Sequence, residues 1–147
     1  LKTFAANTEA VILKNKKESG TTKNEIAYLQ DAIQKNDLTV LPQIVAVAKM
    51  YRDTAAGLAA LPIPEELATD GLALINAMMR ASGIASDFAR VSVDPLATML
   101  ALDQYTQVDE SLVTTFSNIA RVYTAAGVTL PVGTPGATFL DTVKLYE

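Results

Sequence analysis

The hydrophobic positions between Asp94 and Gly127 recur mostly at steps of three and four residues, the period of one face of an α-helix. They are Leu96, Met99, Leu100, Tyr105, Val108, Leu112, Phe116, Ile119, Tyr123 and Ala126. Asp94 can accept from the free amides of the first turn, and Pro95 suits the first helical position because its missing N–H has no partner there. Gly127 favours a left-handed end. The pattern predicts a helix of roughly 50 Å, with neighbouring helices alongside it.

Two shorter helices are predicted at the start of the chain. Residues 1–19 carry apolar positions on one side, and Gly20 ends this stretch. Thr22 and Glu25 have the spacing of a capping box, in which a Thr cap and a Glu three residues later satisfy each other's amides. The capping box predicts the start of a second helix over residues 23–35.

The middle of the chain predicts two longer helices. Residues 41–60 form the first, and its last turns are nearly all small, which favours the close approach of another helix. Pro62 and Pro64 then favour an extended corner, because a proline disfavours helix at the residue before it. The next helix is predicted over residues 64–90.

No strand pattern persists along the chain, so the predicted fold is all-α. We expect a mostly antiparallel helical bundle with three long helices, one or two shorter N-terminal helices and an irregular C-terminal tail. The predicted parts are an N-terminal helical arm (1–35), the bundle (36–127) and the tail (128–147). The tail contains two prolines and two glycines but also apolar residues, which are expected to dock on the bundle or on a neighbouring molecule.

Composition limits the chemistry. The chain has 147 residues, half of them hydrophobic, which fits one domain with its own core. It has no cysteine and no histidine, so thiolate nucleophiles, the usual general base near neutral pH and the commonest metal ligand are missing. We therefore predict that the protein is not an enzyme and that it has no cofactor and no metal site.

The charge is unevenly spread. Residues 1–23 carry five lysines against two glutamates, or +3, so the remainder carries −7 of the total of −4. An acidic body argues against nucleic acid as a partner. The basic arm favours proximity to an anionic membrane surface. The chain begins at Leu1 rather than Met, which predicts that a segment was removed upstream, either by the cell or during sample preparation; a signal peptide or a membrane anchor is a candidate for that segment.

Few residues are candidates for chemistry. Asp103 lies at the edge of the long apolar stripe, where it either pairs with Arg80 or Arg90 or, as we favour, leans into water. The carboxylate pairs at 65–66 and 109–110 are adjacent in sequence, so their members do not face each other as an acid–base pair would.

The methionines and tyrosines have two interpretations. Met50, Met78, Met79 and Met99 are expected to fill gaps in the core. The alternative is a pocket for a small apolar ligand near Tyr51, Met78 and Tyr105. The hydroxyls of Tyr51, Tyr105 and Tyr123 are expected to reach the bundle surface.

Several segments resemble one group of bacterial proteins. They are residues 61–67 (LPIPEEL), 74–78 (LINAM), 94–96 (DPL), 102–105 (LDQY) and 135–139 (PGATF). Together they resemble the poorly characterised exported or membrane-anchored helical proteins of candidate-phyla (Patescibacteria-like) bacteria. The resemblance covers roughly residues 36–140. It implies a cell-envelope setting and brings no catalytic residues.

These observations predict a non-enzymatic, extracytoplasmic protein at the cell surface or secreted, which works by protein–protein contact. It would be a self-assembling subunit of a surface appendage, filament or secretion-type assembly, joined through its N-terminal arm or C-terminal tail. The candidate interface residues are Leu1, Phe4, Val11, Ile12, Phe139, Leu140, Val143, Leu145 and Tyr146.

Overall fold

The structure, a computed structural model, describes residues 1–147 and contains no strand, which confirms the all-α fold. The helices are α1 (Lys2–Ser19), α2 (Glu25–Gln34), α3 (Leu41–Ala59), α4 (Ala68–Phe88), α5 (Pro95–Ala125) and α6 (Ala137–Lys144), and the 3₁₀ turns are η1 (Leu38–Val40) and η2 (Glu65–Leu67).

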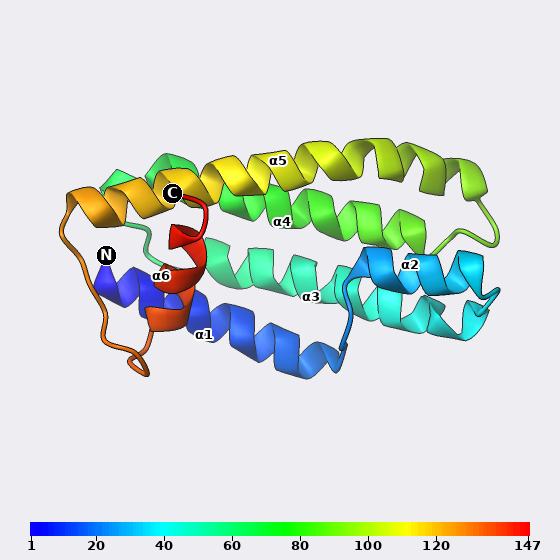
Figure 1. The fold of residues 1–147 in the computed structure, drawn as a ribbon, viewed down its shortest axis with the longest axis horizontal. Helices are drawn as coiled ribbons and strands as arrows, with labels where there is room; N and C mark the ends of the chain where they lie inside the picture. Colours follow the sequence, from blue (N-terminus) through cyan, green and yellow to red (C-terminus); the bar gives the residue numbers. More distant parts are fainter.

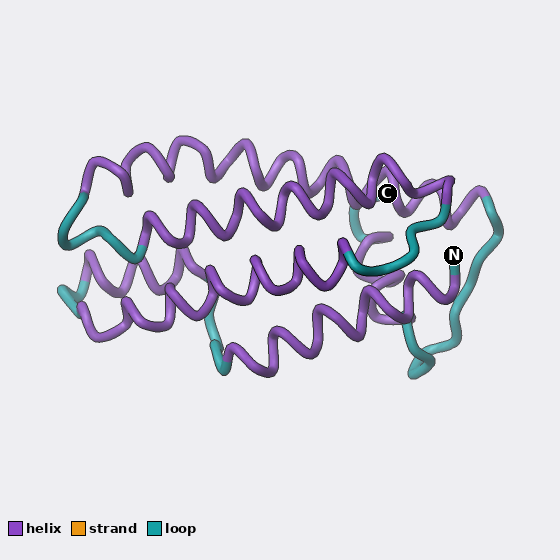
Figure 2. Tube along the Cα trace, turned by 180° about the vertical axis from the view of Figure 1, so that it is seen from behind, coloured by secondary structure: helices purple, strands orange, loops and turns teal.

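The helices form an elongated bundle in which α4 runs antiparallel to both α3 and α5 (Figure 1). α1 and α2 follow one another in the same direction along α3, so that together they take the place of a fourth helix (Figures 1 and 2). α6 lies across the end of the bundle that holds the N-terminus, and it contacts both α1 and α5. The place of a single fourth helix in the bundle is therefore shared by α1, α2 and α6.

The core has two parts along the bundle. At the end with the termini, α1, α5 and α6 close over α3 and α4 through Phe4, Ala5, Leu58, Leu67, Leu74, Ile119, Ala120, Tyr123, Phe139, Leu140 and Val143. At the other end, α2 closes over α3, α4 and α5 through Tyr28, Leu29, Ile44, Val47, Ala48, Ala81, Ile84, Ala85, Phe88, Ala101 and Val108. Leu112 of α5 packs against both parts and joins them.

Two long-range hydrogen bonds fix the ends of the chain. The Tyr123 hydroxyl donates to the Leu1 carbonyl at 2.8 Å. The Phe139 backbone N–H donates to the Glu9 carboxylate at 2.8 Å, so α1 supplies a cap for α6. Two predictions are thereby corrected. The tail is not irregular throughout, because α1 and α5 support a helix there, and the Tyr123 hydroxyl does not reach the surface.

The predicted helix ends are largely confirmed. The Asp94 carboxylate accepts from the Ala97 N–H at 3.1 Å at the start of α5. Gly20 and Gly127 end α1 and α5 with left-handed φ angles of 64° and 62°. These positions depend on local backbone chemistry, which the sequence carries directly.

The capping box predicted at the start of α2 is wrong. Asn24 is the N-cap, and its side-chain oxygen accepts from the Ala27 N–H at 2.8 Å. The Thr22 N–H instead donates to the Tyr28 hydroxyl. Glu25 turns away from the cap and is buried in the bundle.

The first turns of α5 are rotated relative to the predicted stripe. Leu96, Met99 and Leu100 are between 55% and 64% exposed. Thr98 and Ala101 are buried in their place, and the Thr98 hydroxyl donates to a carbonyl in the last turn of α4 at 2.9 Å. The apolar period correctly predicts a helix here, but no neighbouring element covers Leu96, Met99 and Leu100.

α1 and α3 approach closely at Gly57, where an added Cβ would lie 2.6 Å from Cγ1 of Val11. Val11 is β-branched and has little rotamer freedom in a helix. We expect Gly57→Ala to destabilise the protein by about 1–3 kcal/mol, although alanine is the better helix former. The matched control is Gly83→Ala in α4, where nothing lies within 4 Å of the added Cβ. It should stabilise by up to about 1 kcal/mol. Chemical denaturation compares the two, and equal stability of both variants would contradict the close approach.

Candidate functional site

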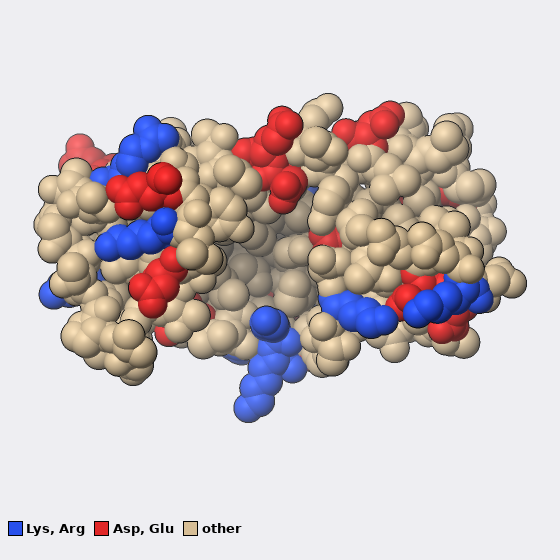
Figure 3. All heavy atoms as spheres, in the orientation of Figure 1, with Lys and Arg blue, Asp and Glu red and all other residues tan.

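One face of the bundle is hollowed in its middle (Figure 3). α5 and α1 border this hollow on its two long sides, and α2 and α6 lie at its two ends. The hollow exists because neither α2 nor α6 extends over the middle of this face. Two small cavities are lined by the surrounding helices, and their α5 residues Leu112 and Phe116 lie one turn apart. The two cavities have different chemistry.

The first cavity, here called the α1/α6 groove, is apolar and has a volume of about 120 Å³. Its lining residues are Glu9, Ile12, Leu13, Phe116, Thr138, Phe139 and Thr142. Leu13 is half exposed. Lys16 and Lys17 follow it by three and four residues, so they lie one turn further along the same side of α1, and both are exposed. The groove therefore has a basic border.

The second cavity, here called the Glu25 cavity, has a volume of about 90 Å³. It is lined by Glu25, Tyr51, Ala81, Ile84, Tyr105, Val108, Asp109 and Leu112. Glu25 is only 3% exposed, and the Tyr51 hydroxyl donates to its two carboxylate oxygens at 2.9 and 3.2 Å. No lysine or arginine nitrogen lies within 4 Å of the carboxylate. The carboxylate is thus buried without a cationic partner.

The two tyrosines of this cavity resist ionisation. Burial raises the pKa of the Tyr51 hydroxyl far above its usual range, and the charge of Glu25 adds to the effect. Burial, together with the charges of Glu25 and Asp109, raises the pKa of Tyr105 to about 12. Both hydroxyls are therefore neutral at ordinary pH, and Tyr51 acts as a hydrogen-bond donor to Glu25. The expectation that these hydroxyls reach the surface fails for Tyr51, which meets Glu25 instead.

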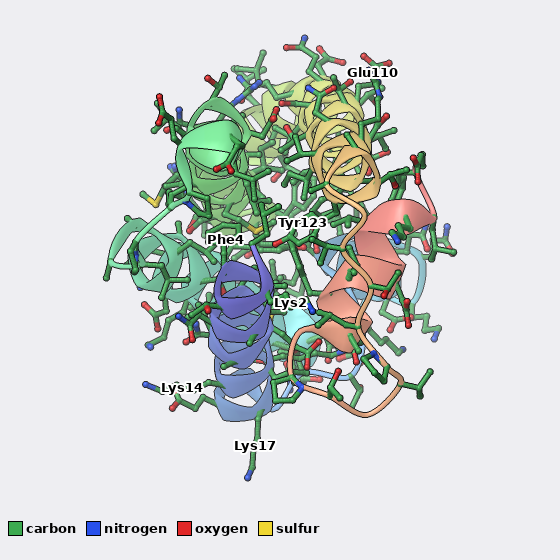
Figure 4. All side chains as sticks on the ribbon, turned by 90° about the vertical axis from the view of Figure 1, so that its left-hand side faces the viewer. Lys2, Phe4, Lys14, Lys17, Glu110 and Tyr123 are labelled. Atoms are coloured by element: carbon green, nitrogen blue, oxygen red, sulfur yellow. The ribbon has the colours of Figure 1, made fainter.

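The structure separates the candidate interface residues into three groups. Phe4, Phe139, Leu140 and Val143 are buried in the chain's own core. Leu1, Val11 and Ile12 are partly buried against that core, and Leu145 and Tyr146 are exposed. Figure 4 shows Phe4 and Tyr123 directed into the end of the bundle. The tail thus docks on its own bundle, one of the two arrangements that the sequence left open.

The other candidates are scattered. Asp103 is exposed and makes no ion pair, as favoured from the sequence, while Arg90 pairs with Asp87 and Asp94. No group of three or more acidic side chains could hold a metal ion. No helix is both long and apolar enough to span a lipid bilayer.

The methionines divide between core and surface. Met78 packs against the core part near the termini, so it does not share a cavity with Tyr51 and Tyr105. Met79 and Met99 are exposed, so the expectation that they fill the core is wrong.

Comparison with protein-family models, curated proteins and solved structures gives no match. The resemblance to candidate-phyla proteins therefore stays a prediction.

Sequence reasoning missed the role of Glu25 because its position before an apolar run is typical of a cap. A second signal was present in the sequence. Glu25, Tyr28, Leu29 and Ala32 follow the spacing i, i+3, i+4, i+7, and all four are buried on one face of α2. A carboxylate on that face must turn toward the bundle.

Alkaline pH tests the buried tyrosines. The folded-state pKa values of Tyr51, Tyr105 and Tyr123 are raised above their ordinary value of 10, to about 12 for the last two. The unfolded chain therefore loses these protons first, and the free energy of unfolding should fall as pH rises from 10 towards 12. Tyr51→Phe should flatten this fall relative to Tyr146→Phe, which removes an exposed hydroxyl. Denaturant titrations at several pH values measure the slopes; equal slopes would contradict the burial of Tyr51.

Proposed function

We propose that this protein works by protein–protein contact, without catalysis, and that its partner is a second copy of the same chain. The supporting observation is an exposed apolar surface at the start of α5. This surface, here called the α5 patch, consists of Val93, Leu96, Met99 and Leu100, each more than half exposed. Contiguous large apolar side chains on a surface are typical of interaction sites.

Charge supports the choice of a second copy. Asp103 and Glu110 continue the exposed side of α5 beyond the patch, and neither has an ion-pair partner. Figure 4 shows Glu110 directed outward from α5, and Lys14 and Lys17 directed outward from α1. The acidic side of α5 and the basic side of α1 are therefore complementary between molecules.

Shape supports the same pairing. The α1/α6 groove offers an apolar concavity beside Lys16 and Lys17, and the α5 patch offers apolar side chains beside Asp103. The two surfaces belong to different ends of the bundle, since the groove adjoins α6 and the patch opens α5 (Figure 1). A contact between them is heterologous and leaves a patch free at one end of the assembly and a groove free at the other. Repeated without closure, such a contact builds a filament.

In this proposal the N-terminal arm contacts the next subunit through its exposed side. The residues of the arm that pack against α6 remain in the core of their own subunit. The proposed setting is extracytoplasmic, in a surface appendage, filament or secretion-type assembly. The resemblance of residues 36–140 to exported proteins is the support for that setting.

Light scattering after size-exclusion chromatography tests the contact. The wild-type mass should rise with protein concentration. A patch variant, Met99→Glu with Leu100→Glu, and a groove variant, Leu13→Glu, should each associate at least tenfold more weakly, since each buries a charge against an apolar surface. Val132→Glu is the control, because Val132 is exposed in the loop before α6 and lies outside both surfaces.

Mixing the two variants decides the geometry. The intact patch of the groove variant can enter the intact groove of the patch variant, so an equimolar mixture should form a dimer of twice 15.6 kDa that grows no further. If the groove variant alone still formed dimers, the patch would pair with itself and the head-to-tail contact would be wrong. A wild-type chain that stays monomeric at millimolar concentration would overturn self-association.

A further inference from the structure

The Glu25 cavity holds a buried carboxyl group that has no basic partner in the protein. Glu25 is 3% exposed, and its hydrogen bonds come from the neutral Tyr51 hydroxyl. Burying a carboxylate without a cation is costly, and a cation of matching size recovers part of that cost. No lysine or arginine of the chain pairs with Glu25, so a cation from solution is free to take that place.

The space beside Glu25 suits an organic cation. The cavity volume of about 90 Å³ exceeds the room that one water needs. Four of its walls are aliphatic side chains, contributed by α4 and α5, and two are the rings of Tyr51 and Tyr105. Aromatic faces attract cations, and aliphatic walls favour an alkyl group over a hydrated ion. Asp109 lines the same cavity and supplies a second carboxylate.

We propose that the Glu25 cavity binds a small organic cation with a primary ammonium group. The ammonium donates to the Glu25 carboxylate, and the short alkyl part lies among Ala81, Ile84 and Val108. Asp109, which is exposed, attracts the cation to the opening on the α5 side.

The surroundings on the opposite side of Glu25 explain why the cation would enter from the α5 side. There Glu25 and Tyr51 also line a larger hollow of about 300 Å³ between α2, α3 and the loop after α1. Lys16 and Lys23 line that hollow, and they repel a cation. The Glu25 cavity on the α5 side has no basic residue in its lining.

A divalent metal ion fits the cavity less well. Calcium takes six to eight oxygen ligands, and magnesium needs six in a regular octahedron. Two carboxylates and two tyrosine hydroxyls do not supply such a set, and no acidic cluster of the chain meets the minimum for a metal site.

The test is a titration of the wild-type protein with ethylammonium chloride, followed by amide NMR. Saturable shifts at Glu25, Tyr51 and Tyr105 are expected, with a dissociation constant of about 1–10 mM for so small a ligand. Ethanol, the neutral molecule of the same size, should give no saturable shift at these residues. Sodium chloride at equal ionic strength should compete weakly.

Variants locate the charge. Glu25→Gln should weaken ethylammonium binding at least tenfold, whereas Glu65→Gln, which changes an exposed carboxylate in η2, should leave it unchanged. Asp109→Asn should weaken ethylammonium binding about threefold. Because Asp109 is exposed, this variant should fold, and it tests the cation site even if Glu25→Gln does not fold.

Three results would overturn the proposal. They are the absence of saturable shifts at these residues in the wild type, equal affinity for sodium ions, and wild-type affinity for ethylammonium in either Glu25→Gln or Asp109→Asn. The site shares no residue with the α5 patch or the α1/α6 groove, so these results are independent of self-association.

Discussion

The length of α5 is the constraint on which the rest of the bundle depends. α5 has 31 residues and its neighbour α4 has 21. At about 1.5 Å per residue, α5 is roughly 15 Å longer than α4, and one helix cannot cover it. Near the termini, α6 folds back and packs against α5. At the other end nothing covers Leu96, Met99 and Leu100, so the same mismatch accounts for both the folded tail and the exposed α5 patch.

The interrupted fourth position has a second effect. α2 and α6 each close one part of the core, and between them the bundle is hollowed (Figure 3). A continuous helix would have filled this space with apolar side chains. The interruption instead places the start of α2, with Glu25, beside Tyr51 and the middle of α5. The gap between α2 and α6 is therefore linked to the burial of the Glu25 carboxylate inside the bundle.

The sequence was informative wherever a feature depends on neighbouring residues. Asp94 with Pro95, Gly20 and Gly127 determine helix ends through their own backbone chemistry, and the helical period identified α1 to α5. It was not informative where a feature depends on distant partners. Periodicity could not tell whether a neighbour reaches Leu96 and Leu100. The cap of α6 comes from Glu9, 130 residues away, so its Gly- and Pro-rich surroundings predicted no helix.

The cap that Glu9 gives to α6 also affects how the chain matures during synthesis. α1 leaves the ribosome well before α6, the helix that completes its buried side. Until then Phe4 lacks Phe139, its neighbour in the same core part, and α1 presents an apolar side to its surroundings. Contacts that span most of a chain form slowly because their loop must close first. The nascent protein therefore passes through a stage in which its N-terminal helix is accessible to chaperones, and α6 ends that stage.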